Sequence, residues 1–417
     1  MSPRRTKIQN PARFTFDGAS FEGEAGESIA QALIAAENLT IARSPKFHRP
    51  RGPACFRAAC DGCLARVDGV PNVMTCLHPL KDGAVVESQN SLGSRDIDLL
   101  RVTDWFFPDG LNHHELFAGV PGVQSIMQAF ARRVAGLGKV PTHSPPPSRS
   151  AIRRDVDCLV VGAGPAGMIA ATALAEKGRR VEMIDDALTP GGGARAVGVA
   201  ERYRAVVEAF GAASLVFRAA TVAVGMFGED VLVVSSDRTE LLRPKTLVLA
   251  TGAHDGVLAF EGNDLPGILS ARAAGWLLAH GVVPGEKIVI VSSQGAGPFG
   301  AACEEALVGF GVNVTHVHGA PLAAKGGTRV KSVLLRDTSG TEKKFACDLL
   351  VVDALRSPSY ELALQAGATL KHQPSGYVVD APDGKIREGV FAVGELVGTP
   401  LDLERMLSDV RRAIAGA

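Results

Sequence analysis

The chain has 417 residues, of which 46% are hydrophobic and 21% charged, a composition typical of a globular protein with two or three domains. The 44 Lys and Arg residues balance the 44 Asp and Glu residues, so charge gives no indication of nucleic-acid or membrane-surface binding. The basic start MSPRRTK is not followed by an apolar segment, and the most apolar stretch, near residues 158–175, contains three glycines and a proline. We therefore expect no signal peptide, no membrane span and a cytoplasmic location.

Residues 1–97 are predicted to form a small β-rich domain. Residues 13–23 alternate apolar and polar side chains around a central Asp-Gly pair, which predicts a β-hairpin. Residues 27–38 have apolar side chains at helical spacing, with Ser28 as the expected N-cap. GAVVESQ, residues 83–89, follows as a further strand. Strands, one helix and a cysteine-rich loop suit a β-grasp ferredoxin domain.

Four of the seven cysteines lie within this domain, with the spacing C-x4-C-x2-C-x12-C. Three ligands on one loop and a fourth further along the chain hold a [2Fe–2S] cluster in plant-type ferredoxins. The alternative is four small core residues without a shared function, although clustered cysteines in a reducing compartment are more often metal or redox ligands. Ala58 and Ala59 stand where such loops usually carry glycine, which adopts a positive φ at lower cost. The predicted cluster ligands are Cys55, Cys60, Cys63 and Cys76.

Residues 98–150 are predicted to connect this domain to the rest of the chain. DWFFPDGLNHHELF, residues 104–117, is rich in aromatic side chains, and the segment 124–138 has a helical pattern. THSPPPSRS, residues 142–150, is typical of a linker. His113 and His114 could be ligands, but we prefer to interpret them as polar linker residues that pack on a neighbouring domain.

From residue 156 the chain has the β-α-β pattern of a dinucleotide-binding fold, with the turn G-x-G-x-x-G between the first strand and the helix. The first glycine permits the tight turn, the second lets the backbone approach a pyrophosphate, and the third lets helix and strand pack closely. The helix N-terminus then offers free N–H groups to the phosphates. An aspartate at the end of the second strand can bind ribose hydroxyls. The predicted contacts are Gly162, Gly164, Pro165, Ala166, Gly167 and Asp185.

A second unit of the same kind covers residues 287–319, and its turn contains Gly295, Gly297 and Gly300. Its second strand ends near His318, with neither an acid for the ribose nor an arginine for a 2′-phosphate. A bound nucleotide and a scaffold copy that binds nothing therefore remain two open interpretations.

Two short strands complete a recognisable order of motifs: TLVLATG, residues 246–252, and GVFAVGE, residues 389–395. The chain here resembles the two-dinucleotide-domain flavoproteins of the thioredoxin and glutathione reductase type. The resemblance implies that Thr251 and Gly252 return the chain toward FAD, and that Gly394 and Glu395 lie against its ribityl-phosphate region. The expected fold class is α/β: a β-grasp [2Fe–2S] domain followed by such a flavoprotein. The expected domains are 1–97, a linker at 98–150, an FAD domain at 151–283 plus 346–417, and a second dinucleotide-binding domain at 284–345.

A closer resemblance rests on the segment ATGAHDGVLAFEGNDLPGILSARAAGWLLAHGVVPG, residues 250–285, and on SPKFHRPRG, residues 44–52. Both are similar to the α subunit of heterotetrameric sarcosine oxidase and to subunits of opine and dye-linked proline dehydrogenases and hydrogen cyanide synthase. VDGVPN, residues 67–72, is similar to the ferredoxin-like subunit of the last family and of hydroxyproline dehydrogenase. In these families a partner of the D-amino-acid-oxidase type oxidises the amine.

The resemblance implies an electron-transfer subunit of an amine or amino-acid dehydrogenase, of the sarcosine, proline, hydroxyproline, opine or glycine type. It implies FAD and a [2Fe–2S] cluster as cofactors, NAD(P) or ATP as alternatives in a nucleotide site, a D-amino-acid-oxidase-like partner and a one-electron acceptor. Two alternatives stay open: a self-sufficient NAD(P)H:acceptor oxidoreductase, and a scaffold subunit with a redox-silent nucleotide. A disulfide reductase fits poorly, because Cys158, Cys303 and Cys347 are isolated. The sequence assigns no catalytic residue.

Overall fold

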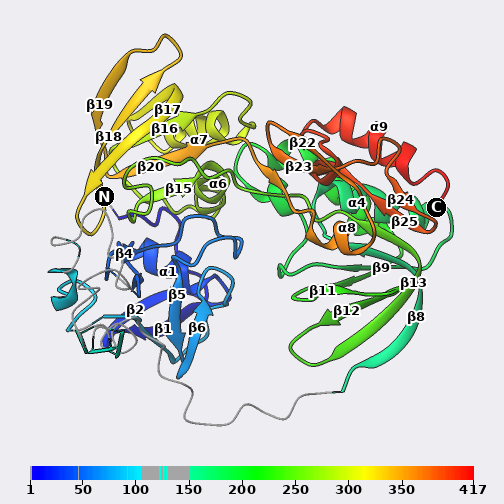
Figure 1. Ribbon diagram of the computed structural model, residues 1–417, viewed down its shortest axis with the longest axis horizontal. Coiled ribbons are helices and arrows are strands. Elements are labelled where there is room, and N and C mark those ends of the chain that lie inside the picture. The colour runs from blue at the N-terminus through cyan, green and yellow to red at the C-terminus, as the bar shows by residue number, and fades with distance from the viewer. Residues whose placement is uncertain are drawn as a thin grey trace.

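A computed structural model of the chain describes residues 2–45, 47–91, 93–102 and 150–417, with isolated positions between 104 and 129. The connecting segment predicted over 98–150, with its aromatic stretch, His113 and His114, lies almost entirely outside the described residues. The described parts form an N-terminal module and two larger α/β units (Figure 1). Among these parts, no helix is long and apolar enough to cross a lipid bilayer.

The N-terminal module is a five-stranded sheet in the order β2-β1-β7-β5-β6, with β1 and β7 parallel and one helix against it. The predicted hairpin is confirmed: Phe14 and Phe16 point into the core, and Asp17 and Gly18 form the turn with φ of 49° and 81°. The predicted cap is also confirmed, since the Ser28 hydroxyl accepts a hydrogen bond from the Gln31 N–H at 3.2 Å. The elements are β1 Pro11–Phe16, β2 Ala19–Glu24, α1 Ile29–Ala35, β3 Ala42–Arg43, β4 Pro50–Arg51, β5 Leu64–Val67, β6 Val70–Met74, β7 Ala84–Glu87 and the 3-10 turn η1 Leu99–Arg101.

The first α/β unit is built on a parallel sheet in the order β10-β9-β8-β13-β25, to which β12 and β11 add an antiparallel extension. Helices α4 and α9 pack against each other on this sheet, and the C-terminus lies near β25 (Figure 1). Its elements up to residue 254 are β8 Ile152–Val161, α4 Pro165–Glu176, β9 Val181–Ile184, η2 Gly192–Arg195, η3 Ala200–Tyr203, α5 Arg204–Ala212, β10 Val216–Arg218, β11 Val222–Phe227, β12 Asp230–Val234, β13 Thr239–Leu249 and β14 Ala253–His254. The later ones are β21 Ser357–Pro358, α8 Glu361–Gln365, β22 Leu370–Gln373, β23 Gly376–Val379, β24 Lys385–Arg387, β25 Val390–Ala392, η4 Gly394–Val397 and α9 Leu403–Ala413.

The second α/β unit has its own sheet in the order β15-β20-β16-β17-β18-β19. The pairing differs from the predicted domain boundaries, which assign β15 and β20 to the first unit. The reason is that β20 inserts between β15 and β16 by parallel hydrogen bonding, a tertiary contact that chain order does not reveal. The elements are β15 Ile268–Ser270, α6 Ala271–Ala279, β16 Ile288–Ser292, α7 Phe299–Gly309, β17 Val314–Gly326, β18 Val330–Asp337, β19 Glu342–Ala346 and β20 Leu349–Asp353.

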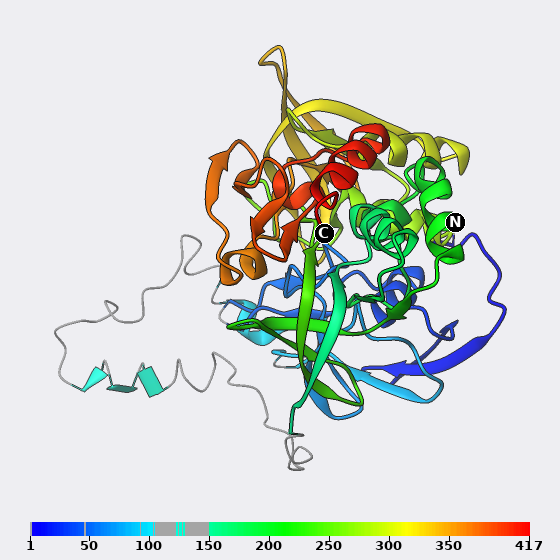
Figure 2. The same ribbon diagram turned by 90° about the vertical axis from the view of Figure 1, so that its right-hand side faces the viewer.

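The N-terminal module lies directly below the second α/β unit in the view of Figure 1, and Figure 2 shows the same parts from the side. The chain start bridges to the second unit, where the Arg5 N–H donates to the Gly281 carbonyl at 2.7 Å. The Thr40 hydroxyl donates to the Thr328 carbonyl at 2.9 Å, and Arg51 forms an ion pair with Asp264. Hydrogen bonds at several places therefore fix the module relative to the second unit.

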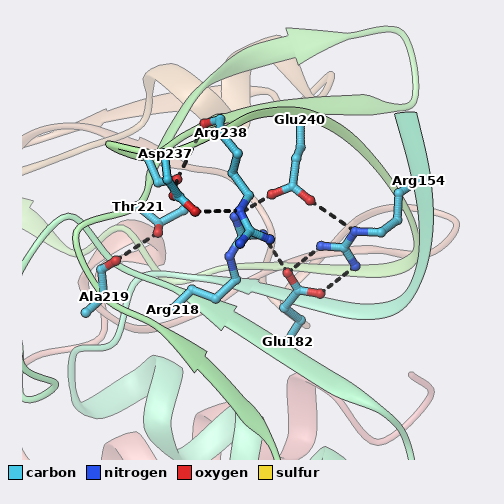
Figure 3. Close-up of polar contacts among 9 residues, drawn as sticks. Arg154, Glu182, Arg218, Ala219, Thr221, Asp237, Arg238 and Glu240 are labelled. Atoms are coloured by element: carbon cyan, nitrogen blue, oxygen red, sulfur yellow. Dashed lines mark hydrogen bonds and ion pairs between the residues drawn. The ribbon is translucent and has the colours of Figure 1, made fainter. Parts of the chain in front are cut away.

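A network of two arginines and two glutamates ties four adjacent strands of the first unit together (Figure 3). Arg154 on β8 binds Glu182 on β9 through both terminal nitrogens at 2.8 Å, and donates to Glu240 on β13 at 3.1 Å. Arg218 on β10 donates to Glu182 at 2.7 Å and also pairs with Glu240. The Arg218 carbonyl accepts the Asp185 N–H at 3.2 Å, so the network also fixes the strand end from which Asp185 projects.

Removing one buried member of this network is expected to destabilise the first unit. Glu240 is only 4% exposed, so Glu240→Ala removes one of the two carboxylates that Arg154 and Arg218 share and leaves them only Glu182, at a cost of roughly 2 kcal/mol, the size of a charge-assisted hydrogen bond. Glu342→Ala is the control, because its pair with Arg336 is about half exposed and such pairs contribute under about 1 kcal/mol. Thermal denaturation should show a clearly larger loss of Tm for Glu240→Ala. Equal losses would contradict a structural role of the network.

Candidate functional site

The candidate cofactor cleft of the first unit lies where its parallel strands end. Gly162 follows β8, Asp185 follows β9, Thr251 follows β13 and Gly394 follows β25. Because the carboxyl ends of parallel strands meet at one edge, segments far apart in sequence come together there. The resulting cleft has a volume of about 310 Å³. Eight of the predicted contacts line it: Gly162, Gly164, Pro165, Ala166, Asp185, Thr251, Gly252 and Glu395.

The glycines around this cleft occupy different environments. A Cβ on Gly162 would lie 2.3 Å from the Ala250 carbonyl oxygen, and one on Gly167 would lie 1.9 Å from the Gly162 carbonyl oxygen. Gly164, the N-cap of α4, has open space around its Cβ position and faces the cleft. Gly394 lies behind the cleft, where a Cβ would meet Ala166 at 2.5 Å. Close packing therefore requires three of these glycines, whereas at Gly164 the space is free for a ligand.

Asp185 lines the cleft directly after β9 and is held by the glycine-rich turn itself. Its carboxylate accepts the Ala163 N–H at 2.5 Å and the Ala187 N–H at 2.8 Å. Burial raises the pKa of Asp185, and the two N–H groups and the charge of Arg57 act in the opposite direction. The neighbouring Asp186 also lines the cleft and is exposed. Both carboxylates can accept hydrogen bonds from ribose hydroxyls.

Arg272 on α6 supplies a buried positive charge to the same cleft. It is 6% exposed, pairs with Asp255 at 2.9 Å and donates to the Ala253 carbonyl at 3.1 Å. Its Nη2 is buried without a hydrogen-bond partner among the described residues. Burial lowers the pKa of this guanidinium. A buried donor without a partner is costly, so Arg272 fits a ligand with an acceptor group in this cleft.

The four clustered cysteines form two close pairs. The Cys55 thiol donates to the Cys60 sulfur at 3.4 Å, and Cys63 and Cys76 are hydrogen-bonded to each other. The hydrogen bond from Cys55 lowers the pKa of Cys60 to about 6, and that from Cys76 lowers the pKa of Cys63. In the described part of the chain, no three His, Cys, Asp or Glu side chains converge as a single metal ion would require. Two pairs suit a binuclear cluster, in which each iron takes two protein sulfurs.

The cysteine loop reaches its conformation without the expected glycine. Ala58 adopts φ of 56° and Phe56 adopts φ of 53°, both in the left-handed region. Backbone hydrogen bonds run from Arg57 and Ala59 to the Cys55 sulfur and from Ala58 to the Cys76 sulfur. Ala58 therefore adopts the left-handed backbone conformation that glycine usually has in a ferredoxin loop.

A second cleft, of about 490 Å³, lies between the two α/β units. Gly295 and Gly297 line it together with Arg356, whose Nη1 would lie 2.1 Å from a Cβ on Gly297. Arg356 donates to Glu395 at 2.6 Å, and Glu395 lines both clefts. A guanidinium beside a glycine-rich turn can bind a phosphate group.

The rest of the second turn is directed away from this cleft. Gly300 does not line it but packs against Ser292 and Asp353, where a Cβ would lie 2.5 Å from the serine hydroxyl. His318, at the ribose position, stacks on His316 at 4.8 Å and also does not line the cleft. At the position where the sequence lacks a ribose-binding acid, the structure therefore has His318, which does not line this cleft.

Three arginines that line the two clefts could not be identified as site residues from the sequence: Arg57, Arg272 and Arg356. Arg57 lies inside the cysteine loop, and Arg272 inside the segment 250–285 that carries the family resemblance. The location of Arg57 and Arg272 within these motifs was the feature of the sequence that could have indicated a role for them. Their direction toward a cleft depends on how the domains pack, which no local pattern encodes.

Two regions of the chain match known protein families. Residues 9–91 match the family described as 2Fe-2S iron-sulfur cluster binding domain, and residues 156–326 match the family described as pyridine nucleotide-disulphide oxidoreductase. The predicted fold class is confirmed: an N-terminal ferredoxin-like domain is followed by an α/β oxidoreductase fold with two parallel-sheet units. The two matches indicate a [2Fe–2S] cluster and FAD as the cofactors of the chain.

Relatives of three kinds confirm the closer resemblance that the sequence motifs predicted. The chain is 28% identical over 370 residues to the alpha subunit of sarcosine oxidase from Rhizobium meliloti, covering 80% of this chain and 37% of that protein. It is 31% identical to an opine oxidase subunit from Agrobacterium tumefaciens, over 37% of this chain and 35% of the relative. It is 29% identical to the hydrogen cyanide synthase subunit HcnB from Pseudomonas aeruginosa, over 38% of each. The chain thus spans little more than a third of the length of these relatives.

One solved structure shares the fold over the whole chain. L-proline dehydrogenase from P. horikoshii superposes with a TM-score of 0.72, at 23% sequence identity, covering 100% of this chain and 75% of that one. At this identity the likeness concerns the fold alone.

Proposed function

We propose that this chain is the FAD- and [2Fe–2S]-carrying electron-transfer subunit of a heteromeric amine or amino-acid dehydrogenase. The observation that carries the proposal is the position of the cysteine loop: Arg57, between two of the predicted cluster ligands, lines the candidate FAD cleft. Two redox groups bound there would be neighbours within one chain. A flavin accepts two electrons and releases them singly, and such a cluster takes one at a time.

The predicted roles of the chain's own residues follow from this arrangement. Gly164 gives a pyrophosphate access to the N-terminus of α4, Asp185 receives ribose hydroxyls, and Arg272 offers a donor to an acceptor group. Cys55 and Cys60 would hold one iron, and Cys63 and Cys76 the other. In this proposal the chain binds and orients the cofactors, and a partner protein holds the amine.

The relatives support a role within a complex of several subunits, since all three kinds are named as subunits and two of them as oxidases. We propose that the partner is a flavoprotein of the D-amino-acid-oxidase type and that the acceptor is a one-electron carrier. We also propose a cytoplasmic location, which the seven free cysteines favour because reducing compartments keep thiols unpaired.

The test compares the isolated chain with a reconstituted pair. Alone, the chain is expected to oxidise none of proline, hydroxyproline, sarcosine, glycine and opines. Together with a D-amino-acid-oxidase-like partner it should form a stable hetero-oligomer, and one of these substrates should then reduce an artificial dye. Bleaching of the isolated chain's flavin by an amine would overturn the relay and make the chain itself the dehydrogenase.

The same preparation tests the two alternatives. Bleaching of the isolated chain's flavin by NADH or NADPH would favour a self-sufficient NAD(P)H:acceptor oxidoreductase, with the nucleotide in the second cleft. A chain that holds a nucleotide but shows no flavin absorbance would favour a scaffold role.

A further inference from the structure

Arg57 connects the cysteine loop with the candidate FAD cleft. It lies between Cys55 and Cys60 in sequence, is half-buried, and lines the cleft together with Gly164 and Asp185. Among the described residues its guanidinium makes no hydrogen bond and no ion pair, whereas its backbone N–H faces the Cys55 sulfur at 3.4 Å. The side chain is therefore a cationic donor available to a ligand in the cleft, attached to a backbone that belongs to the cysteine loop.

The charges around the cleft favour an anionic ligand at this point. The charge of Arg57 acts on the Asp185 carboxylate and on the guanidinium groups of Arg195 and Arg272, so these charged groups lie close to Arg57. The Arg195 guanidinium is stacked on the Trp276 ring at 3.7 Å, and Arg272 is paired with Asp255. Within the described part of the chain, Arg57 alone of the three has no such partner. The pyrophosphate of a dinucleotide carries the charge and the acceptor oxygens that a free guanidinium binds well.

The position of Arg57 depends on the cysteine sulfurs. The residues on both sides of it, Phe56 and Ala58, hold positive φ angles, which L-amino acids adopt only when their surroundings enforce them. Backbone hydrogen bonds from Arg57 and Ala59 to the Cys55 sulfur, and from Ala58 to the Cys76 sulfur, support this conformation. A bound cluster would fix these sulfurs, whereas free thiols can rotate and let the strained backbone relax.

A second link holds the base of the loop against the cleft. The Ala54 carbonyl accepts the Ser270 N–H at 2.9 Å, and the Ser270 hydroxyl donates to Asp255 at 2.7 Å. Asp255 in turn pairs with Arg272, which lines the cleft. The loop is thus attached, next to its first cysteine, to β15 of the second unit, close to the cleft-lining Arg272. The conformation of the loop then decides where Arg57 points.

We propose that Arg57 is a positioning residue through which cluster assembly strengthens FAD binding, because the assembled loop presents its guanidinium to the dinucleotide pyrophosphate. The inference rests on the two cofactors of the proposed function, but not on a substrate, a partner or an acceptor. It predicts thermodynamic coupling: FAD binds more tightly to the chain that holds its cluster than to the chain that lacks it.

The experiment is a double-mutant cycle on the dissociation constant of FAD, measured by flavin fluorescence with anaerobically prepared full-length chain. With the cluster present, Arg57→Gln is expected to raise the Kd about tenfold, the size of one charge-assisted contact. Its iron content and cluster absorbance should stay at the wild-type level. Arg13→Gln is the matched control, because Arg13 lies on β1 of the same module with its side chain 81% exposed, and it should change neither quantity.

The cluster-free arm uses Cys60→Ser and, as a check on folding, wild-type chain from which iron has been removed by a chelator. Both are expected to raise the Kd of FAD about tenfold in the wild-type background, but to add little in the Arg57→Gln background. Three results would overturn the inference: an unchanged Kd in cluster-loaded Arg57→Gln, an equal effect of cluster loss in both backgrounds, or a wild-type chain that binds no FAD. Since no amine or partner takes part, failure of the electron relay would leave this result unaffected.

Discussion

Replacing Cys60 by serine is expected to abolish or strongly alter the iron–sulfur signal of this protein. Wild-type chain prepared without oxygen should hold about two irons, and after dithionite reduction it should give the rhombic EPR signal of one [2Fe–2S]⁺ centre. The Cys60 sulfur is the thiolate-like member of its pair and the acceptor of the Cys55 hydrogen bond. A serine hydroxyl is a far weaker ligand for iron than a thiolate.

Cys347→Ala is the matched control for this substitution. Cys347 is buried and, like Cys60, is not in a disulfide, but it lies in the second α/β unit and lines neither of the two clefts. The iron content and EPR signal of this variant should equal those of the wild type. Stoichiometric zinc without iron in anaerobically prepared wild type would show that the four cysteines hold a different metal.

Replacing Gly164 by valine is expected to release the dinucleotide while the chain stays folded. Gly164 has φ of −72° and ψ of 179°, which any residue adopts, and no atom lies within 4 Å of its Cβ position among the described residues. The Cβ of a valine would therefore meet no clash, and the side chain would occupy the approach of a pyrophosphate to α4. We expect FAD binding to weaken at least about tenfold, or 1.4 kcal/mol, measured by flavin fluorescence and by nucleotide extraction.

Two other glycines provide the controls for this prediction. Gly211→Val places the same side chain on the exposed face of α5, where the described chain again leaves the Cβ position open, and should leave FAD binding unchanged. Gly167→Val should instead lower Tm, because its Cβ would collide with the Gly162 carbonyl oxygen. Full retention of FAD by Gly164→Val, or correctly folded wild type that yields no nucleotide on extraction, would contradict the assignment of this cleft.

The local elements of this protein follow from short stretches of sequence. The Asp17-Gly18 turn and the alternating side chains of β1 and β2 depend on neighbours in the chain, and so does the Ser28 cap of α1. The strand–glycine–helix order after residue 156 also has a local cause, because Gly162 is the residue that permits the turn. These features could be predicted because their energetics involve residues close in sequence.

The sequence by itself therefore determined the N-terminal module, the two dinucleotide-binding motifs and the residue types that the cofactors require. The tertiary structure decided which of these residues meet. Membership of β15 and β20 in the second sheet depends on hydrogen bonds between distant segments. The direction of Arg57 into the FAD cleft depends on the packing of one module against another, and on the positive φ of Ala58 that the cysteine sulfurs support. The physical reason is that such contacts gain their free energy from burial and charge between surfaces far apart in sequence, which propensity and spacing do not register.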